Sequence, residues 1–186
     1  LILSGVKLIS YYQEEKLQSS NTAQNIINLK PSERLNVLVF GAGAIGIEFA
    51  YFYSVLGTKV TVIEMLDHIL PVEDVEVSQT LEKNFKKRGI DIYTKTMVEK
   101  AEVKGNRVAV TINQNSQKKE LSADKVLSAI GVTGNVEGFG LEELRIELFK
   151  NHIKVDKRTF QTNTQDIYAI VDVIGPPWLA HVASAE

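Results

Sequence analysis

The stretch Asn36-Val-Leu-Val-Phe-Gly-Ala-Gly-Ala-Ile-Gly46 decides the fold class of this chain. Its first five residues form a short apolar run bounded by turn residues, which predicts a strand buried on both faces. Three glycines follow at once, in the pattern G-x-G-x-x-G, at Gly41, Gly43 and Gly46. The sequence therefore predicts a strand that leads directly into a tight glycine turn.

A helix and a second strand are expected after this turn. Residues 47–56 carry apolar and aromatic side chains at helical spacing, and Gly57 stands where a helix C-cap is expected. The β-branched run Lys59–Ile63 then predicts a second buried strand. The order strand, glycine turn, helix, strand is a βαβ unit.

The three glycines suit a phosphate-binding turn. Gly41 permits the tight turn, Gly43 lets a diphosphate approach the backbone because it lacks a Cβ, and Gly46 lets the helix lie close to the sheet. The first amides of the helix and its dipole attract an anion. Taken alone, the pattern also fits a glycine-rich turn without a ligand. Its place between a strand and a helix favours a dinucleotide site.

Glu64 ends the second strand. It follows the last glycine of the turn at close to the sequence spacing of about 20 residues at which dinucleotide sites carry an acidic residue. A carboxylate there accepts the adenosine ribose hydroxyls and repels a 2′-phosphate. Met65 and Leu66 follow, where proteins that bind NADP usually offer arginine. We therefore predict NAD rather than NADP. The alternative is that Glu64 is only a solvated charge at a strand end.

The remaining pattern completes an α/β prediction: a Rossmann-type, mostly parallel sheet with helices on its faces and an antiparallel β-meander inserted. The expected elements are strands at 6–10, 91–94, 125–130, 153–156 and 167–171, helices at 12–17 and 73–88, a loop at 19–25 and a meander at 98–121.

Composition excludes several classes of function. With 21 basic and 23 acidic residues among 186, the net charge of −2 offers no basic face for nucleic acid or an anionic membrane. No apolar run spans a bilayer and no secretory signal is evident, so we expect a cytoplasmic protein. There is no cysteine, hence no thiol nucleophile, and no metal site is predicted. His68 and His152 are expected at the surface.

Several segments together resemble the central domain of dihydrolipoamide dehydrogenases, a group of disulfide oxidoreductases to which glutathione and mercuric reductases are related. These segments are Gly41-Ala-Gly-Ala-Ile-Gly-Ile-Glu-Phe-Ala50, Thr58-Lys-Val-Thr-Val-Ile-Glu64, Leu127-Ser-Ala-Ile-Gly131, Gly140-Leu-Glu-Glu-Leu144, Ile167-Tyr-Ala-Ile-Val-Asp172 and Leu179-Ala-His181. The resemblance runs from about Asn36 to the last residue.

The resemblance implies roles for particular residues. Residues Gly41, Ala42, Gly43, Ala44, Ile45, Gly46, Ile47 and Glu48 would wrap the NAD diphosphate, Glu48 pointing toward the nicotinamide end. Glu64 would hold the ribose, Val98 would touch the adenosine side, and Gly131 would pass close to the cofactor. Asp172, with Trp178, Leu179, Ala180 and His181, would face FAD. The relatives have glycine where this chain has Val171, which places FAD binding by this segment in doubt.

The same resemblance implies parts that these residues lack: an FAD fingerprint, a redox cysteine pair and a catalytic His–Glu dyad. His181 and Glu186 have the spacing of that dyad, but His181 already fits the flavin segment, so no catalytic residue is predicted. The chain begins at Leu1 and ends without a helix-stop signal, and we expect it to be part of a longer protein. Its expected parts are 1–18, from the FAD domain or a connector; 19–35, a linker; 36–157, the NAD domain; and 158–186, a return toward the FAD domain.

The functional hypothesis is an NAD(H)-binding domain of a dihydrolipoamide dehydrogenase that is inactive alone. The intact enzyme would be a homodimer that uses FAD and meets the lipoyl domains of 2-oxo acid dehydrogenase complexes. Two alternatives stay open: a stand-alone NADH sensor, and the NAD domain of another disulfide reductase.

Overall fold

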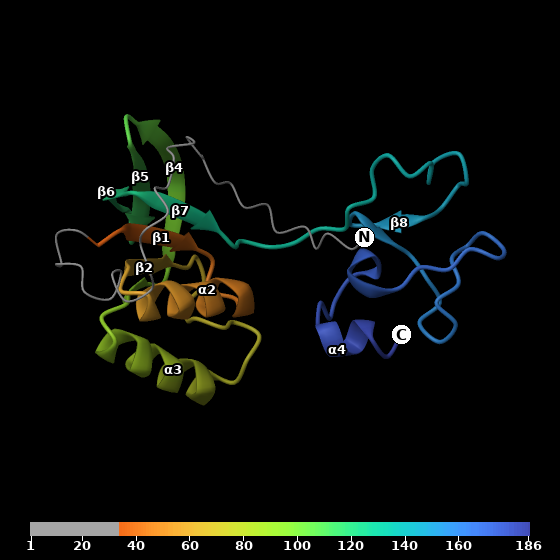
Figure 1. The fold of residues 1–186 in the computed structure, drawn as a ribbon, viewed down its shortest axis with the longest axis horizontal. Coiled ribbons are helices and arrows are strands. Elements are labelled where there is room, and N and C mark those ends of the chain that lie inside the picture. Colours follow the sequence, from red (N-terminus) through yellow and green to blue (C-terminus); the bar gives the residue numbers. More distant parts are fainter. Residues whose placement is uncertain (1–33) are drawn as a thin grey trace, which may run out of the picture. The chain divides into compact units, whose positions relative to one another are not determined.

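The computed structural model describes residues 34–186, so the elements expected at 6–10, 12–17 and 19–25 lie outside the described residues. The described part packs as two compact units, one that ends at Ile130 and one that comprises Gly131–Glu186 (Figure 1). The division reflects packing within each unit. The domain boundaries expected from the sequence stay a proposal.

A four-stranded parallel sheet, in the order β3-β2-β1-β7, organises the first unit. Its strands are β1 (Asn36–Phe40), β2 (Lys59–Ile63), β3 (Asp91–Tyr93) and β7 (Lys125–Ser128). Strands β1 and β2 are confirmed with the bounds that the sequence predicts. The helices α2 (Ala44–Val55) and α3 (Val75–Lys87) lie on one side of this sheet (Figure 1).

The predicted antiparallel meander is also confirmed, as β4 (Thr96–Lys104), β5 (Arg107–Gln114) and β6 (Gln117–Ala123). It lies on the other side of the parallel sheet from the helices (Figure 1). Side chains of β1 alternate between two cores: Val37 and Val39 belong to the helix-side cluster, Leu38 and Phe40 to the meander-side cluster. Cover on both faces explains why β1 is an uninterrupted apolar run.

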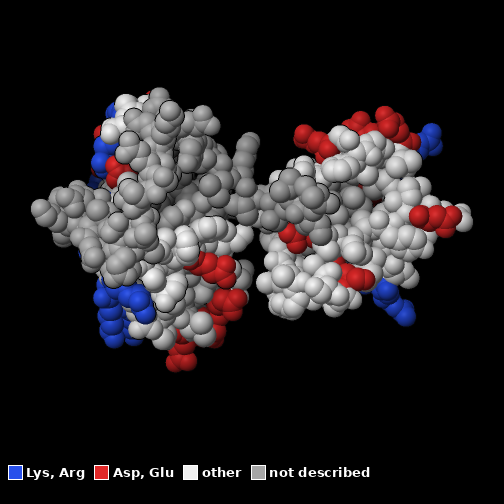
Figure 2. Space-filling view, viewed as in Figure 1, with Lys and Arg blue, Asp and Glu red and all other residues white. Residues whose placement is uncertain are grey.

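Helix α3 begins and ends at residues that the sequence marks. The Asp74 side chain caps its start by accepting the amide of Glu76 at 2.8 Å, and Gly89 follows its end at φ +82°. Acidic side chains gather near its start and basic side chains near its end, and Figure 2 shows this polarity on the surface. The arrangement suits the helix dipole, which favours negative charge at Asp74 and Glu76.

The second unit has little regular structure. It contains the short hairpin β8 (Leu148–Phe149) and β9 (His152–Ile153), the 3-10 helix η2 (Val171–Ile174) and the short helix α4 (Ala180–Ala183). The strand expected at 153–156 is reduced to its first residue. The strand expected at 167–171 is wrong, because Tyr168 makes one isolated bridge and Asp166 and Val171 adopt positive φ. Positive φ on both sides prevents an extended strand.

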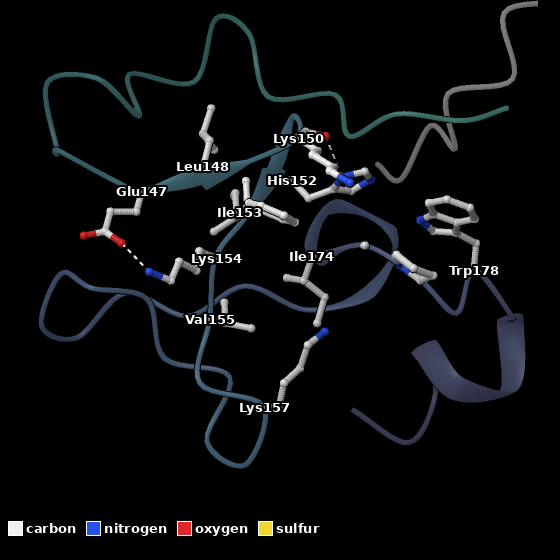
Figure 3. Close-up of a pocket in the computed structure, with 13 residues that line it drawn as sticks. Glu147, Leu148, Lys150, His152, Ile153, Lys154, Val155, Lys157, Ile174 and Trp178 are labelled. Carbon is white, nitrogen blue, oxygen red and sulfur yellow. Dashed lines mark hydrogen bonds and ion pairs between the residues drawn. The ribbon is translucent and has the colours of Figure 1, made fainter.

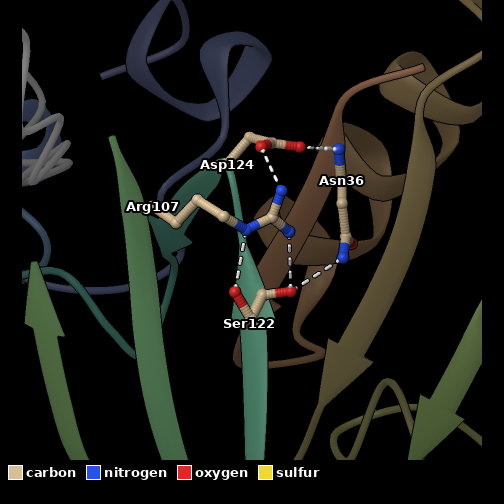
Figure 4. Close-up of polar contacts among 4 residues, drawn as sticks. All are labelled: Asn36, Arg107, Ser122 and Asp124. Carbon is tan, nitrogen blue, oxygen red and sulfur yellow. Dashed lines mark hydrogen bonds and ion pairs between the residues drawn. The ribbon is translucent and has the colours of Figure 1, made fainter. Parts of the chain in front are cut away.

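A polar cluster joins the meander to the start of β1 (Figure 4). Asp124 accepts the backbone amide of Asn36 at 2.7 Å and the Arg107 guanidinium at 2.8 Å. Arg107 also donates to the Ser122 hydroxyl at 2.8 Å, and the Asn36 side chain donates to the Ser122 carbonyl at 2.9 Å. One carboxylate therefore fixes where the meander lies along β1.

Replacing this carboxylate by an amide is expected to destabilise the first unit. In Asp124→Asn, the NH₂ group must face either Arg107 or the Asn36 amide, a donor against a donor. We expect the free energy of unfolding in urea to fall by about 1–2 kcal/mol. The control Glu120→Gln removes an exposed ion pair with Lys104 at 3.6 Å and should change it by less than about 0.5 kcal/mol. Equal losses would contradict the assignment.

Candidate dinucleotide-binding site

The glycine turn sits where β1 ends, against the end of β7. Gly41 adopts φ +90°, and its amide donates to the carbonyl of Ile63 at 2.9 Å, which ties the turn to β2. A Cβ at Gly41 would lie 2.4 Å from the carbonyl oxygen of Ala129. Both the backbone angle and this close approach exclude any larger residue.

Gly43 and Gly46 differ in what surrounds them. A Cβ at Gly46 would lie 2.0 Å from the carbonyl oxygen of Gly41, so the start of α2 packs directly on the turn. A Cβ at Gly43 would meet no atom within 4 Å, and its φ of −69° suits any residue. The fold requires the first and third glycines but not the second. The open space at Gly43 is what a diphosphate approaching the backbone would need.

The start of α2 supplies amides that the helix does not use. The amide of Ile47, which donates to the carbonyl of Gly43 at 3.0 Å, is the first to find its acceptor four residues back. The amides that precede it stand at the positive end of the helix dipole. Ala44 and Glu48 are exposed and Ile45 is partly exposed, whereas Ile47 is buried in the core. The turn can therefore present backbone donors to an anion.

Glu64 lies beside this turn, not in solvent. Its side chain is buried, the residue being 7% exposed, so the alternative of a solvated charge is wrong. One carboxylate oxygen accepts the amide of Ala42 at 2.6 Å, and the other accepts the amide of Leu66 at 2.8 Å. No ion pair to Glu64 occurs within residues 34–186. Each oxygen keeps a lone pair with which it could accept a hydroxyl.

Ala42 differs from its neighbours in the turn because both its amide and its carbonyl are hydrogen-bonded within the protein. Its amide is used by Glu64, its carbonyl accepts the amide of Leu70 at 2.7 Å, and it is fully buried. Its backbone donor is therefore committed within the protein. Direct contact of Ala42 with a cofactor stays a prediction that this bonding does not favour.

The other residues expected on the NAD side are less well defined. Val98 lies in β4 at a β-bulge, partly buried against the meander-side core. Gly131 adopts φ +150°, and a Cβ there would meet nothing within 4 Å. Packing against this core accounts for Val98, and the positive φ accounts for Gly131, so the contacts of both residues with a dinucleotide stay predictions.

The residues expected to face FAD all lie in the second unit, which the structure does not position against the first. There, Trp178 stacks on His152, with 5.9 Å between ring centroids, at a cavity of about 800 Å³ between the β8–β9 hairpin and residues 174–178 (Figure 3). Asp172, Leu179, Ala180 and His181 do not line this cavity. Of the residues expected to face FAD, only Trp178 therefore lies at this cavity.

Both histidines expected at the surface are partly buried. His152 packs against Trp178 and its Nε2 is buried without a hydrogen-bond partner among the described residues. The side chain of His68 is 24% exposed, and its hydrogen bond to Asp67 lowers the pKa of that carboxyl. Sequence reasoning missed these contacts because isolated histidines in polar stretches carry no periodic signal. No group of metal-ligating side chains occurs within 34–186.

Val171 adopts φ +64°, in the left-handed region where β-branched residues are rare. The position is the one at which the resembled family has glycine. Its amide donates to the Glu186 carboxylate at 2.6 Å, so Glu186 is engaged with the backbone of η2.

Alanine substitutions should separate the three glycines. Gly41→Ala and Gly46→Ala drive a Cβ into a carbonyl oxygen, and we expect each to lower the free energy of unfolding by about 2 kcal/mol or more. Gly43→Ala should leave it within about 0.5 kcal/mol. Gly105→Ala, at φ +64° with no neighbour within 4 Å, controls for backbone strain alone. Urea unfolding measures all four, and a loss at Gly43 equal to that at Gly41 would contradict the geometry.

Placing glycine at position 171 should stabilise the second unit. Val171→Gly relieves a left-handed β-branched residue, and we expect a gain of about 1 kcal/mol. Trp178 is the only tryptophan of the chain, so its fluorescence reports unfolding of this unit. Val173→Gly, in the same 3-10 helix without positive φ, should instead lose stability. A loss in both variants would refute the strain argument.

Most of this chain is similar to known proteins. The family described as pyridine nucleotide-disulphide oxidoreductase matches residues 4–186. The chain is 46% identical to a dihydrolipoyl dehydrogenase of Mycobacterium leprae over 151 residues, which cover 81% of the chain and 32% of the relative. It is 40% identical to that of Bacillus subtilis over 153 residues, covering 81% and 32%. The chain therefore spans about a third of the length of these relatives.

Two solved structures share the fold. LpdA from Mycobacterium tuberculosis is 33% identical at a TM-score of 0.73, covering 82% of this chain and 33% of its own. The HOCl-induced flavoprotein disulfide reductase RclA from Escherichia coli, as its Cu(II) complex, is 28% identical at a TM-score of 0.73, covering 81% and 33%. No helix in the described part is long and apolar enough to cross a membrane. The family match and the relatives together show that the chain belongs to the pyridine nucleotide-disulphide oxidoreductases.

Proposed function

We propose that this chain is the NAD(H)-binding part of a flavin-dependent dihydrolipoamide dehydrogenase. The observation that carries the proposal is the pairing of an open glycine turn with a buried carboxylate bonded to it. In this proposal Gly43 and the first amides of α2 hold the diphosphate. Glu64 accepts the adenosine ribose hydroxyls. The family uses FAD and NAD(P) in general, and the preference for NAD is specific to our proposal.

The charge around Glu64 supports NAD over NADP. Glu64 is a buried carboxylate with no cationic partner within the described residues, and Met65 and Leu66 follow it. A 2′-phosphate would place two further negative charges beside an uncompensated one, whereas a neutral diol donates hydrogen bonds to it. The hydride chemistry belongs to the cofactors, and the protein's part is to position the dinucleotide.

The rest of the enzyme lies outside these residues in the proposal. With no cysteine, the chain offers no thiol to exchange with a lipoamide disulfide, so alone it should not turn over lipoamide. The intact protein would be a cytoplasmic homodimer that binds FAD, partly through the segment around Asp172, and accepts lipoyl domains. Val171 stands where the resemblance implies glycine, and its side chain would leave less room for FAD than glycine.

One alternative has its own support. RclA, a flavoprotein disulfide reductase, shares the fold at 28% identity, so another disulfide reductase could carry this domain. The identity of 40–46% to dihydrolipoyl dehydrogenases favours the lipoamide branch. A stand-alone NADH sensor is less favoured, because residues 131–186 match the family but contribute no part of the glycine turn.

Calorimetric titration tests the proposal. We expect the wild-type chain to bind NADH more tightly than NADPH by at least about tenfold, because of the charge at Glu64. Gly43→Ala should weaken NADH binding by at least about tenfold while its unfolding stays unchanged. Gly89→Ala, outside the site after α3, adds backbone strain at φ +82° without a side-chain clash, and it should leave NADH affinity unchanged. Tighter binding of NADPH, or measurable lipoamide turnover by this chain, would overturn the proposal.

A further inference from the structure

We infer that Glu64 has a second task besides holding a sugar: in the ligand-free protein it holds the glycine turn in the shape that receives a diphosphate. The functional meaning of this inference rests on the proposed NAD(H) binding. Its structural content concerns the protein alone and is tested separately.

The geometry that points to this task is a bridge made by one carboxylate. Its first oxygen accepts the amide of Ala42, inside the glycine turn, at 2.6 Å. Its second oxygen accepts the amide of Leu66, where the chain leaves β2, at 2.8 Å. The backbone of Glu64 is itself fixed, since its amide donates to Tyr93 and its carbonyl accepts from Thr96. A rigid strand end therefore holds the turn.

Glu64 is the only side chain that hydrogen-bonds residues 41–46 in the described part of the chain. The other long-range bonds of the turn join backbone to backbone: Gly41 to Ile63, and Leu70 to Ala42. Ala42 directly precedes Gly43, the glycine that no internal contact explains. Losing the Glu64 bond would free the residue next to the open space. A substitution that removes the Glu64 carboxylate would thus act on the phosphate-binding turn without removing a contact to the phosphate.

Burial makes the bridge hard to replace. Ala42 is fully buried, so water cannot readily reach its amide, and leaving that amide without an acceptor is costly. Glutamine has one acceptor oxygen, so its NH₂ group must face one of the two amides. Aspartate lacks one methylene and is too short to span both. Both variants remove one end of the bridge but keep a polar side chain.

The same carboxylate would then link two recognition events. Each oxygen has one lone pair occupied by a backbone amide and one left for a hydroxyl. A ribose diol that binds to these lone pairs meets a carboxylate whose position is already fixed by its bond to Ala42. Sugar recognition and the shape of the diphosphate site thus depend on one residue, which we assign as a positioning residue for the turn.

Amide hydrogen exchange in the ligand-free chain tests the bridge. In Glu64→Gln and Glu64→Asp we expect at least one of the Ala42 and Leu66 amides to exchange roughly tenfold faster or more than in wild type. The amide of Val62, in the core of β2, serves as an internal reference, and Glu73→Gln, an exposed acid between β2 and α3, as the matched control. Unchanged exchange at both amides, or an equal acceleration at Val62, overturns the inference.

Binding of a modified ligand separates positioning from sugar contact. The probe is an NADH analogue whose adenosine ribose lacks both hydroxyls. If Glu64 only held the sugar, wild type and Glu64→Gln would bind this analogue equally, and that result overturns the inference. If Glu64 also positions the turn, Glu64→Gln should bind it about fivefold more weakly or worse. Failure of wild type to bind NADH would refute the proposed function, and the exchange experiment would still decide the bridge.

Discussion

The hydrogen bond between the Glu64 carboxylate and the amide of Ala42 is the interaction on which the candidate site depends. It joins the two features that define a dinucleotide site, a glycine turn and an acidic strand end, in one contact that the protein makes by itself. The carboxylate is buried without a cationic partner in the described residues. This explains both why it hydrogen-bonds backbone amides and why it would repel a further anion.

The sheet makes that contact possible. Strands β1 and β2 run parallel in register, with Phe40 opposite Ile63, so the turn and the acidic residue leave the sheet side by side. Helices cover one face and the meander covers the other, and the Asp124 cluster joins the meander to β1. Because β1 is buried on both faces, its position cannot shift without disturbing two cores.

Much of this unit could be predicted from the sequence, because its signals are local. Alternation, glycines and caps predicted β1 and β2 to the residue and α3 to within two residues, whereas α2 begins three residues before its predicted start. The pattern of turns predicted the meander. The features that the sequence did not predict depend on contacts between residues distant in sequence. They are the burial of Glu64, the use of the Ala42 amide by Glu64, and the stacking of His152 on Trp178. The expected strand at 167–171 failed because residues 131–186 provide no neighbouring strand to pair with it, and Val171 turns left-handed.

The first unit builds the glycine turn and its carboxylate from its own residues, and the second carries the residues expected to face FAD. The most direct test of the central claim is a crystal structure of the chain with NADH. Our account predicts the diphosphate over Gly43 and the adenosine ribose hydroxyls within hydrogen-bonding distance of the Glu64 carboxylate, which still holds Ala42. A dinucleotide bound elsewhere, or a Glu64 carboxylate turned away from the ribose, would contradict it.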